Sequence, residues 1–178
     1  TITNTASYTL TVSGGVTVAG TFATATASTI VMTGSPATLA ATSELYNLDI
    51  GGTVSLGTHA LSLAGTLTVS GSLDDSNLGM SVAASSINGS VKSGSAPCSV
   101  AGATSGTGSW SAGAGRVTFG GDFGLSTLTA SSGTIDLNGS IVALSTFTRN
   151  TSTVVIGGGA SQAVTTSAQK FYNLTINT

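Results

Sequence analysis

Short stretches in which apolar and small polar residues alternate run through most of the chain. Val, Ile, Leu or Phe takes every second position, and Thr, Ser or Ala fills the positions between. A period of two predicts a β-strand with one buried face and one polar, uncharged face. No segment carries apolar residues at helical spacing over three turns. The predicted strands are residues 8–12, 16–22, 29–33, 46–50, 53–56, 60–63, 66–69, 116–119, 126–129, 134–137, 141–144, 146–148, 153–156 and 172–176.

Glycine separates many of these strands, often as Gly-Gly or Ser-Gly. The chain has 25 glycines and only 2 prolines. Because glycine adopts positive φ angles without steric cost, we expect it to form tight corners between strands.

The chain also repeats itself over a long distance. Residues 28–50 resemble residues 152–176, and both segments end on a Tyr-Asn-Leu motif. Residues 9–22 align without a gap on residues 134–147 at nearly the same offset. The offset subdivides into units of roughly 42 residues, a period typical of solenoids. Each unit is expected to form two turns of about 21 residues, stacked about 4.8 Å apart.

One region interrupts the pattern. From about residue 74 to residue 115 the alternation weakens, and Gly, Ser and Ala dominate. We expect an irregular insertion there, within a single domain that spans residues 1–178. The region contains Trp110, the only tryptophan of the chain. Because loops often carry function and tryptophan is enriched at interfaces, Trp110 is a candidate contact residue.

Two segments of the chain suggest a family. GTVSLGTHALSLAGTLTVSGSL (residues 52–73), followed later by FYNLTI (residues 171–176), resembles the β-strand repeats of very large secreted surface proteins of bacteria and archaea. Those proteins are adhesin-like, sheath-like or filament-like. The resemblance covers most of the chain outside residues 74–115. It implies β-solenoid architecture and an extracellular location at the cell surface.

The composition narrows the classes of partner. Only 6% of the residues are charged, where roughly 25% is usual, and the net charge is −2. Without a basic patch, nucleic acid is not an expected partner. The chain is 40% hydrophobic, so we expect it to be ordered. No apolar run reaches the roughly 18 residues of a membrane-spanning helix, so no membrane span is expected.

The two ends of the chain read as parts of one pattern. Joined tail to head, FYNLTINT and TITNTASYTLTVSGG resemble the internal segment YNLDIGGTVSLGTHALSL. Isolated solenoids need polar caps, and this pattern has none. We therefore expect either a segment of a longer repeat protein or ends that pair with neighbouring copies. Open strand edges template such pairing, and a head-to-tail contact that does not close produces a filament.

The sequence offers no catalytic constellation. His59 is the only histidine, and no Gly-x-Ser-x-Gly motif accompanies it, so we expect an exposed corner residue. Asp74 and Asp75 are adjacent and would point to opposite faces of a strand, which does not suit glycoside hydrolysis. A solvated turn is expected there, with a weak calcium site as the alternative. No enzymatic activity, metal or cofactor is expected.

Five residues are candidates for covalent modification. A single cysteine in a secreted protein suggests an intermolecular disulfide through Cys98, and a buried small side chain is the alternative. Among the sequons, Asn88 is the best glycosylation candidate because it lies in the expected insertion, whereas Asn173 is expected to cap a corner. The Asn-x-Ser/Thr sequons are Asn88, Asn138, Asn150 and Asn173.

These patterns predict an all-β, right-handed β-helix-like β-solenoid. A β-sandwich completed by a neighbour's strand is the alternative fold. The expected function is that of a non-enzymatic extracellular structural protein that self-assembles as a homopolymer into a filament, sheath or surface layer. One alternative is an adhesin or stalk that binds cell-surface glycans. The other is an ice-binding solenoid, which the uneven spacing of the Thr-x-Thr pairs disfavours.

Overall fold

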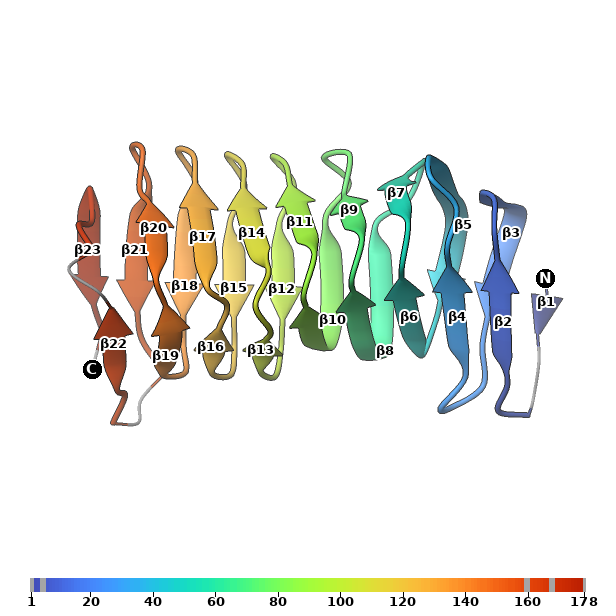
Figure 1. Ribbon diagram of the computed structural model, residues 1–178, viewed down its shortest axis with the longest axis horizontal. Helices are drawn as coiled ribbons and strands as arrows, with labels where there is room; N and C mark the ends of the chain where they lie inside the picture. Colours follow the sequence, from blue (N-terminus) through green and yellow to red (C-terminus); the bar gives the residue numbers. More distant parts are fainter. Residues whose placement is uncertain (1, 4–5, 159–160, 167–168, 178) are drawn as a thin grey trace.

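The computed structural model describes residues 2–3, 6–158, 161–166 and 169–177. The described backbone is all-β, without a helix, and winds into a rod of stacked turns (Figure 1). Every pair of neighbouring strands among these residues is parallel, from β2 and β4 near the N-terminus to β21 and β23 near the C-terminus. The predicted β-solenoid is therefore confirmed. The alternative β-sandwich is wrong, because sandwich sheets are built from antiparallel strands.

Most turns contain three short strands, which define three sides of the coil. The first face comprises the first halves of β3 (Val16–Ala23) and β5 (Ala37–Glu44), then β7 (Thr53–Leu56), β9 (Ser72–Asp74), β11 (Ser90–Ser93), β14 (Ser109–Ala112), β17 (Thr127–Ala130) and β20 (Thr146–Thr148). The second face comprises the second halves of β3 and β5, the first halves of β8 (Leu61–Val69) and β10 (Met80–Ile87), then β12 (Cys98–Val100), β15 (Val117–Phe119), β18 (Thr134–Leu137), β21 (Thr153–Ile156) and β23 (Asn173–Ile176). The third face comprises β2 (Thr9–Val12), β4 (Thr29–Met32), β6 (Asn47–Ile50), the second halves of β8 and β10, then β13 (Thr104–Ser105), β16 (Phe123–Gly124), β19 (Ile141–Leu144) and β22 (Val164–Thr166). β1 (Ile2–Thr3) pairs with the end of β3.

A turn is shorter than the sequence pattern suggested. Leu61 pairs with Met80, Met80 with Cys98, and Cys98 with Val117, so these turns contain 18 or 19 residues rather than about 21. The reason is that most corners need only a few residues between strands. Longer turns occur near the ends of the rod, where the register shifts between β3 and β5 and between β19 and β22.

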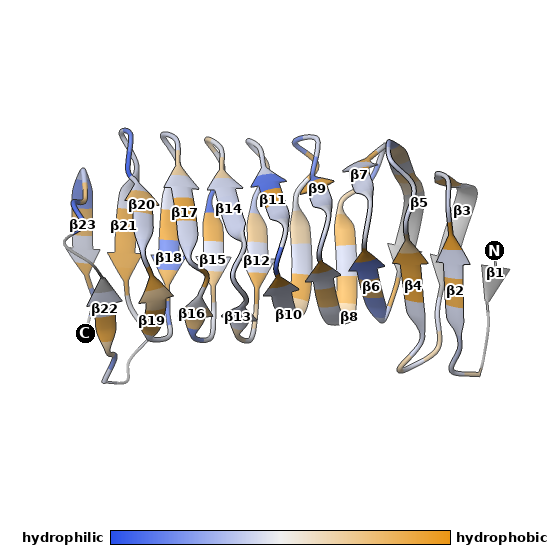
Figure 2. Ribbon diagram, in the orientation of Figure 1, coloured by the Kyte–Doolittle hydropathy of each residue, from blue (hydrophilic) through white to orange (hydrophobic). Residues whose placement is uncertain are grey.

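Apolar side chains of successive turns stack inside the coil. On the first face, Val54, Leu73 and Val91 are aligned by strand pairing, and each is at most 1% exposed. On the third face, strand pairing aligns Ile30, Leu48 and Leu67 in the same way. Figure 2 shows the resulting apolar bands across the strands. Full burial of one such side chain stabilises the fold by about 1.5–3 kcal/mol, so the interior column is the main source of stability.

A column of glycines forms the corner between the third and first faces. Gly71 illustrates the reason, because a Cβ atom there would lie 2.0 Å from the carbonyl oxygen of Gly52 in the preceding turn. That oxygen accepts a hydrogen bond from the backbone N–H of Ser72 at 2.8 Å, so the two turns cannot move apart freely. Close approach of backbones, rather than positive φ, explains these glycines. The column comprises Gly34, Gly52, Gly71, Gly89 and Gly108.

The expected irregular insertion at residues 74–115 is instead regular coil. β10, β12 and β15 pair in register through it, as do β9, β11 and β14. Several inward positions here carry small polar side chains, among them Ser85, Ser93 and Thr104, which are each at most 3% exposed. Because these residues replace Val, Ile and Leu inside the coil, the alternation that predicts strands disappears from the sequence although the strands remain.

The two copies of the Tyr-Asn-Leu motif make the same local contacts. The side-chain amide of Asn47 donates to the hydroxyl of Thr29 at 3.4 Å, and that of Asn173 donates to the hydroxyl of Thr153 at 3.5 Å. The first copy, however, lies on the third face and the second copy on the second face. The sequence repeat therefore marks equivalent stacked strands, but the two copies are a third of a turn out of phase.

Candidate functional site

Among the described residues, the interior column of apolar side chains has exposed members at both ends of the rod. Near the N-terminus, Leu10 is 40% exposed although its strand partner Ile30 is fully buried. Near the C-terminus, Leu174 is 45% and Ile176 is 64% exposed, and they pair with Val154 and Ile156. Both end strands, β2 and β23, have one neighbour each in the described sheet. Each end therefore presents a strand edge together with exposed apolar side chains that continue the interior column.

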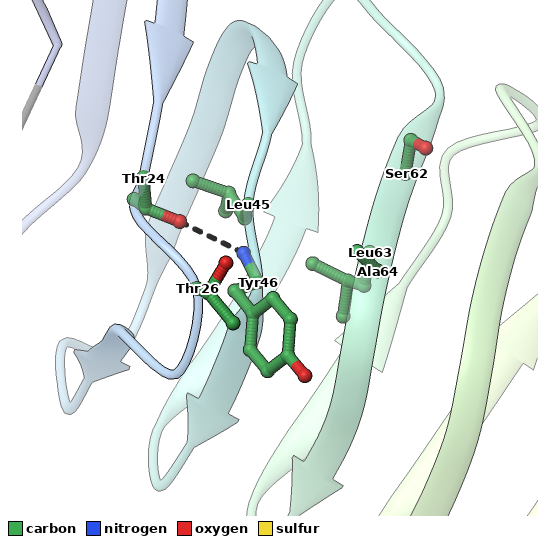
Figure 3. A pocket seen from close by; sticks show the side chains of 7 residues that line it. All are labelled: Thr24, Thr26, Leu45, Tyr46, Ser62, Leu63 and Ala64. Carbon is green, nitrogen blue, oxygen red and sulfur yellow. Dashed lines mark hydrogen bonds between the residues drawn. The ribbon is translucent and has the colours of Figure 1, made fainter. Parts of the chain in front are cut away.

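A groove with a volume of about 440 Å³ lies at the corner between the second and third faces. Figure 3 shows the ring of Tyr46 inside it, between Thr26 on one side and the strand of Leu63 and Ala64 on the other. The lining comes from three successive turns and consists of Thr24, Thr26, Leu45, Tyr46, Ser62, Leu63 and Ala64.

The length of the corner explains why the groove forms at this place. Five residues, 24–28, join β3 to β4, whereas only Leu45 and Tyr46 join β5 to β6 in the next turn. The long corner turns back through a hydrogen bond from the N–H of Ser28 to the carbonyl of Ala25 at 3.1 Å. On the other side, β8 runs through the corner as continuous strand. The Tyr46 ring lies in the space between the long corner and β8.

A second groove, of about 380 Å³, follows the outside of the second face. Hydroxyl groups of Ser62, Ser81 and Ser99 line it, and these residues are aligned by strand pairing. Arg116 lies at its end, where the guanidinium donates to Asp136, with an Nη2–Oδ1 distance of 2.9 Å. Asp136 raises the pKa of Arg116. The one charged side chain that lines the groove is therefore already paired with a carboxylate.

Rows of hydroxyl groups also cover the first face. Strand pairing aligns one row of six residues: Thr53, Ser72, Ser90, Ser109, Thr127 and Thr146. The parallel row is interrupted by Asp74 and Lys92, whose side chains form an ion pair at 2.8 Å. A regular ice-binding array requires even rows of threonine, and half of the complete row is serine. The ice-binding alternative gains no support from this face.

The two adjacent aspartates have different surroundings. Asp74 points outward and its hydrogen bond to Lys92 lowers its pKa, whereas Asp75 is fully buried. Asp75 Oδ1 accepts hydrogen bonds from the backbone N–H groups of Asn77 and Gly94, both at 2.9 Å. The turn is therefore only half solvated, in contrast to expectation. Among the described residues, no group of three or more His, Cys, Asp or Glu side chains is placed to hold a metal ion.

Trp110 lies inside the coil. Its side chain is 1% exposed, its ring meets that of Phe119 edge to face at 5.1 Å between centroids, and its Nε1–H donates to Ser93 Oγ at 3.0 Å. A residue in this position cannot contact a partner on the surface, so the proposed contact role of Trp110 does not fit the structure.

His59 does occupy an exposed corner, with its Nδ1 2.8 Å from the hydroxyl of Thr58.

Cys98 also faces the interior. It is 2% exposed, and its thiol donates to Asp75 Oδ2 at 3.2 Å. Burial, followed by the hydrogen bond to Asp75 and the charge of that carboxylate, raises the pKa of the thiol to about 12. Intermolecular disulfides form through exposed thiolates, so this placement fits the alternative of a buried small side chain.

The raised thiol pKa predicts a loss of stability at alkaline pH. The unfolded chain loses the Cys98 proton near its ordinary pKa of 9.0, while the folded protein keeps it until about 12. The stabilising contribution is therefore complete below pH 9 and falls as the pH rises toward 12, by at most about 1.4 kcal/mol per pH unit.

Urea unfolding at pH 8 and at pH 10.5 measures this effect. The control is Cys98→Ser, which keeps a donor for Asp75 but does not ionise in this range. We expect the midpoint of the wild-type protein to fall further than that of the control. Parallel behaviour of the two proteins would contradict the prediction.

The four sequon asparagines lie at corners of the coil or beside them. Asn88 and Asn150 are exposed, Asn138 is half-buried, and Asn173 is exposed. Asn88 Oδ1 accepts a hydrogen bond from the backbone N–H of Thr107 at 3.2 Å, so it caps a corner of the coil rather than lying in an irregular insertion. Glycosylation of these residues stays a prediction.

Sequence patterns missed the groove, whereas exposed ends agree with the expectation that the repeat pattern has no polar caps. Tyr46 was visible as part of a repeated motif, but its position in a groove depends on the unequal corners of neighbouring turns.

No helix among the described residues is long and apolar enough to cross a membrane. Comparison with known proteins finds no matching family model, no matching curated protein and no matching solved structure.

Proposed function

We propose that the protein is a non-enzymatic structural solenoid of the cell surface that assembles end to end with further copies of itself. The observation that carries this proposal is the exposure of interior-column side chains at both ends of the described rod. Leu10 at one end, and Leu174 and Ile176 at the other, are the exposed members of columns whose other members are buried.

Stacking of a second copy on such an end would bury these side chains and would pair the free strand edge at the same time. An unpaired edge is a template for another strand, and each apolar side chain removed from water adds to the stability of the contact. β2 and β23 contain no charged residue. A contact along these strands would therefore neither desolvate a charge nor bring like charges together. A contact between the two different ends does not close on itself and therefore produces a filament.

The cell-surface location is supported by the resemblance of residues 52–73 and 171–176 to surface repeats. The low charge is consistent with a structural role outside the cell. With few ionisable groups, a wall built from this coil gains or loses little stability as pH changes, and salt has few charges to screen.

Negative-stain electron microscopy and sedimentation velocity test the proposal. We expect rods that lengthen as the protein concentration rises, and short rods only for the double variant Leu174→Lys/Ile176→Lys, because two charges would then be buried at the contact. Val142→Lys is the matched control, since Val142 is 52% exposed on the third face, away from the end strand β23. Short rods for the wild-type protein at every concentration, or equal assembly of the double variant, would overturn end-to-end assembly.

A further inference from the structure

The groove around Tyr46 has the size and chemistry of a ligand site. Its volume of about 440 Å³ falls within the range of small-molecule pockets, roughly 300–1,000 Å³. The aromatic ring of Tyr46 supplies a flat apolar surface, and the hydroxyl-bearing side chains of Thr24, Thr26 and Ser62 also line the groove. We propose that this groove binds a neutral sugar ring, such as one unit of a surface glycan.

The lining chemistry selects this class of ligand. A pyranose has one face of C–H groups and a rim of hydroxyls, each of which both donates and accepts hydrogen bonds. The electron-rich face of an aromatic ring attracts the C–H face, and Thr and Ser hydroxyls match the rim in both roles. None of the seven lining residues is charged, so the groove has no counter-ion for a phosphorylated, sulfated or acidic ligand.

The backbone that carries Tyr46 is fixed by the coil before any ligand arrives. The backbone N–H of Tyr46 donates to Thr24 Oγ1 at 2.8 Å, and Oδ1 of the following Asn47 accepts from the N–H of Thr66 at 2.9 Å. Gly65 leaves room for the ring, because a Cβ atom there would lie 2.9 Å from Tyr46 Cδ1. A platform on rigid strands loses little conformational freedom on binding, which favours affinity.

The position of this groove is independent of end-to-end assembly. It lies on the side of the rod, at the corner between β5 and β6, whereas assembly uses the edges of β2 and β23. Sugar binding and polymer formation can therefore succeed or fail separately.

Saturation-transfer NMR with the purified protein tests the proposal. The probes are the methyl glycosides of glucose, galactose, mannose and N-acetylglucosamine, together with sialyllactose and a sulfated disaccharide as charged comparisons. We expect transfer to the C–H protons of at least one neutral glycoside. The affinity should fall by about tenfold or more in Tyr46→Ala and be retained in Tyr46→Phe, because the ring face is the contact.

Two further variants make the result specific to the groove. Ala64→Leu, at an exposed lining position, should block binding by filling the groove without removing any contact of the fold. Tyr172→Ala makes the same chemical change in the other Tyr-Asn-Leu motif and should leave sugar binding unchanged. Absence of transfer to every neutral glycoside at millimolar concentration, a preference for the charged sugars, or binding that survives both Tyr46→Ala and Ala64→Leu would overturn the proposal.

Discussion

Replacement of Gly52 by alanine should destabilise the protein by roughly 3 kcal/mol or more. The new Cβ atom would lie 2.0 Å from the carbonyl oxygen of Gly34 and 2.7 Å from that of Thr33. The Gly34 oxygen cannot retreat easily, because the N–H of Thr53 donates to it at 3.1 Å and thereby ties the two turns together. The clash involves backbone on both sides, so a side-chain rotation cannot relieve it.

The neighbouring residue provides a matched control. A Cβ atom at Gly51 would meet nothing closer than 3.9 Å, so Gly51→Ala should be neutral or stabilise the protein by up to about 1 kcal/mol through the unfolded chain. Urea unfolding followed by circular dichroism measures both variants. Equal midpoints for the two alanine variants would show that close backbone approach does not explain the glycine column.

The second large effect is expected at Trp110. Trp110→Ala should cost about 3–5 kcal/mol, because it removes the largest buried side chain of the coil and leaves a cavity beside Phe119. Trp110→Phe is the control that keeps an aromatic ring but removes the hydrogen bond to Ser93. We expect that variant to lose less, since one buried hydrogen bond contributes about 0.5–1.5 kcal/mol.

Denaturant unfolding and thermal melting of the two Trp110 variants decide between a core role and a surface role. A surface contact residue would change stability by less than about 0.5 kcal/mol when truncated. A Trp110→Ala variant with wild-type stability would therefore contradict the interior placement.

The contrast between residues 53–69 and residues 74–115 shows how far sequence patterns reach. In β7 and β8, inward Val54, Leu56 and Leu67 alternate with outward Thr and Ser, so the strands were predictable. In the later segment, the interior is filled partly by large rings such as Trp110 and partly by small polar residues such as Ser93. A hydroxyl group inside the coil forms its hydrogen bond with a residue of a neighbouring turn. Because that partner is distant in sequence, local patterns do not predict the buried polar residue.

The sequence by itself determined most strands of the outer thirds, though not β5 or β22, together with the parallel stacking implied by an internal repeat and the scarcity of charge. These properties are local or follow from a period, and a period is visible in one dimension. The Asn47 and Asn173 contacts confirm that the repeated motif specifies a repeated local geometry.

Only the tertiary structure decided the length of a turn in the middle of the rod, which is 18 or 19 residues. It also decided that the two repeat copies lie a third of a turn apart. Finally, it decided that Trp110 and Cys98 lie inside the coil. The physical reason is that a residue in a solenoid makes its decisive contacts one turn away. Corner length, the filling of the interior and the close approach of the glycines depend on neighbouring turns together. The Tyr46 groove has the same origin, because it exists only where a long corner and a short corner are stacked.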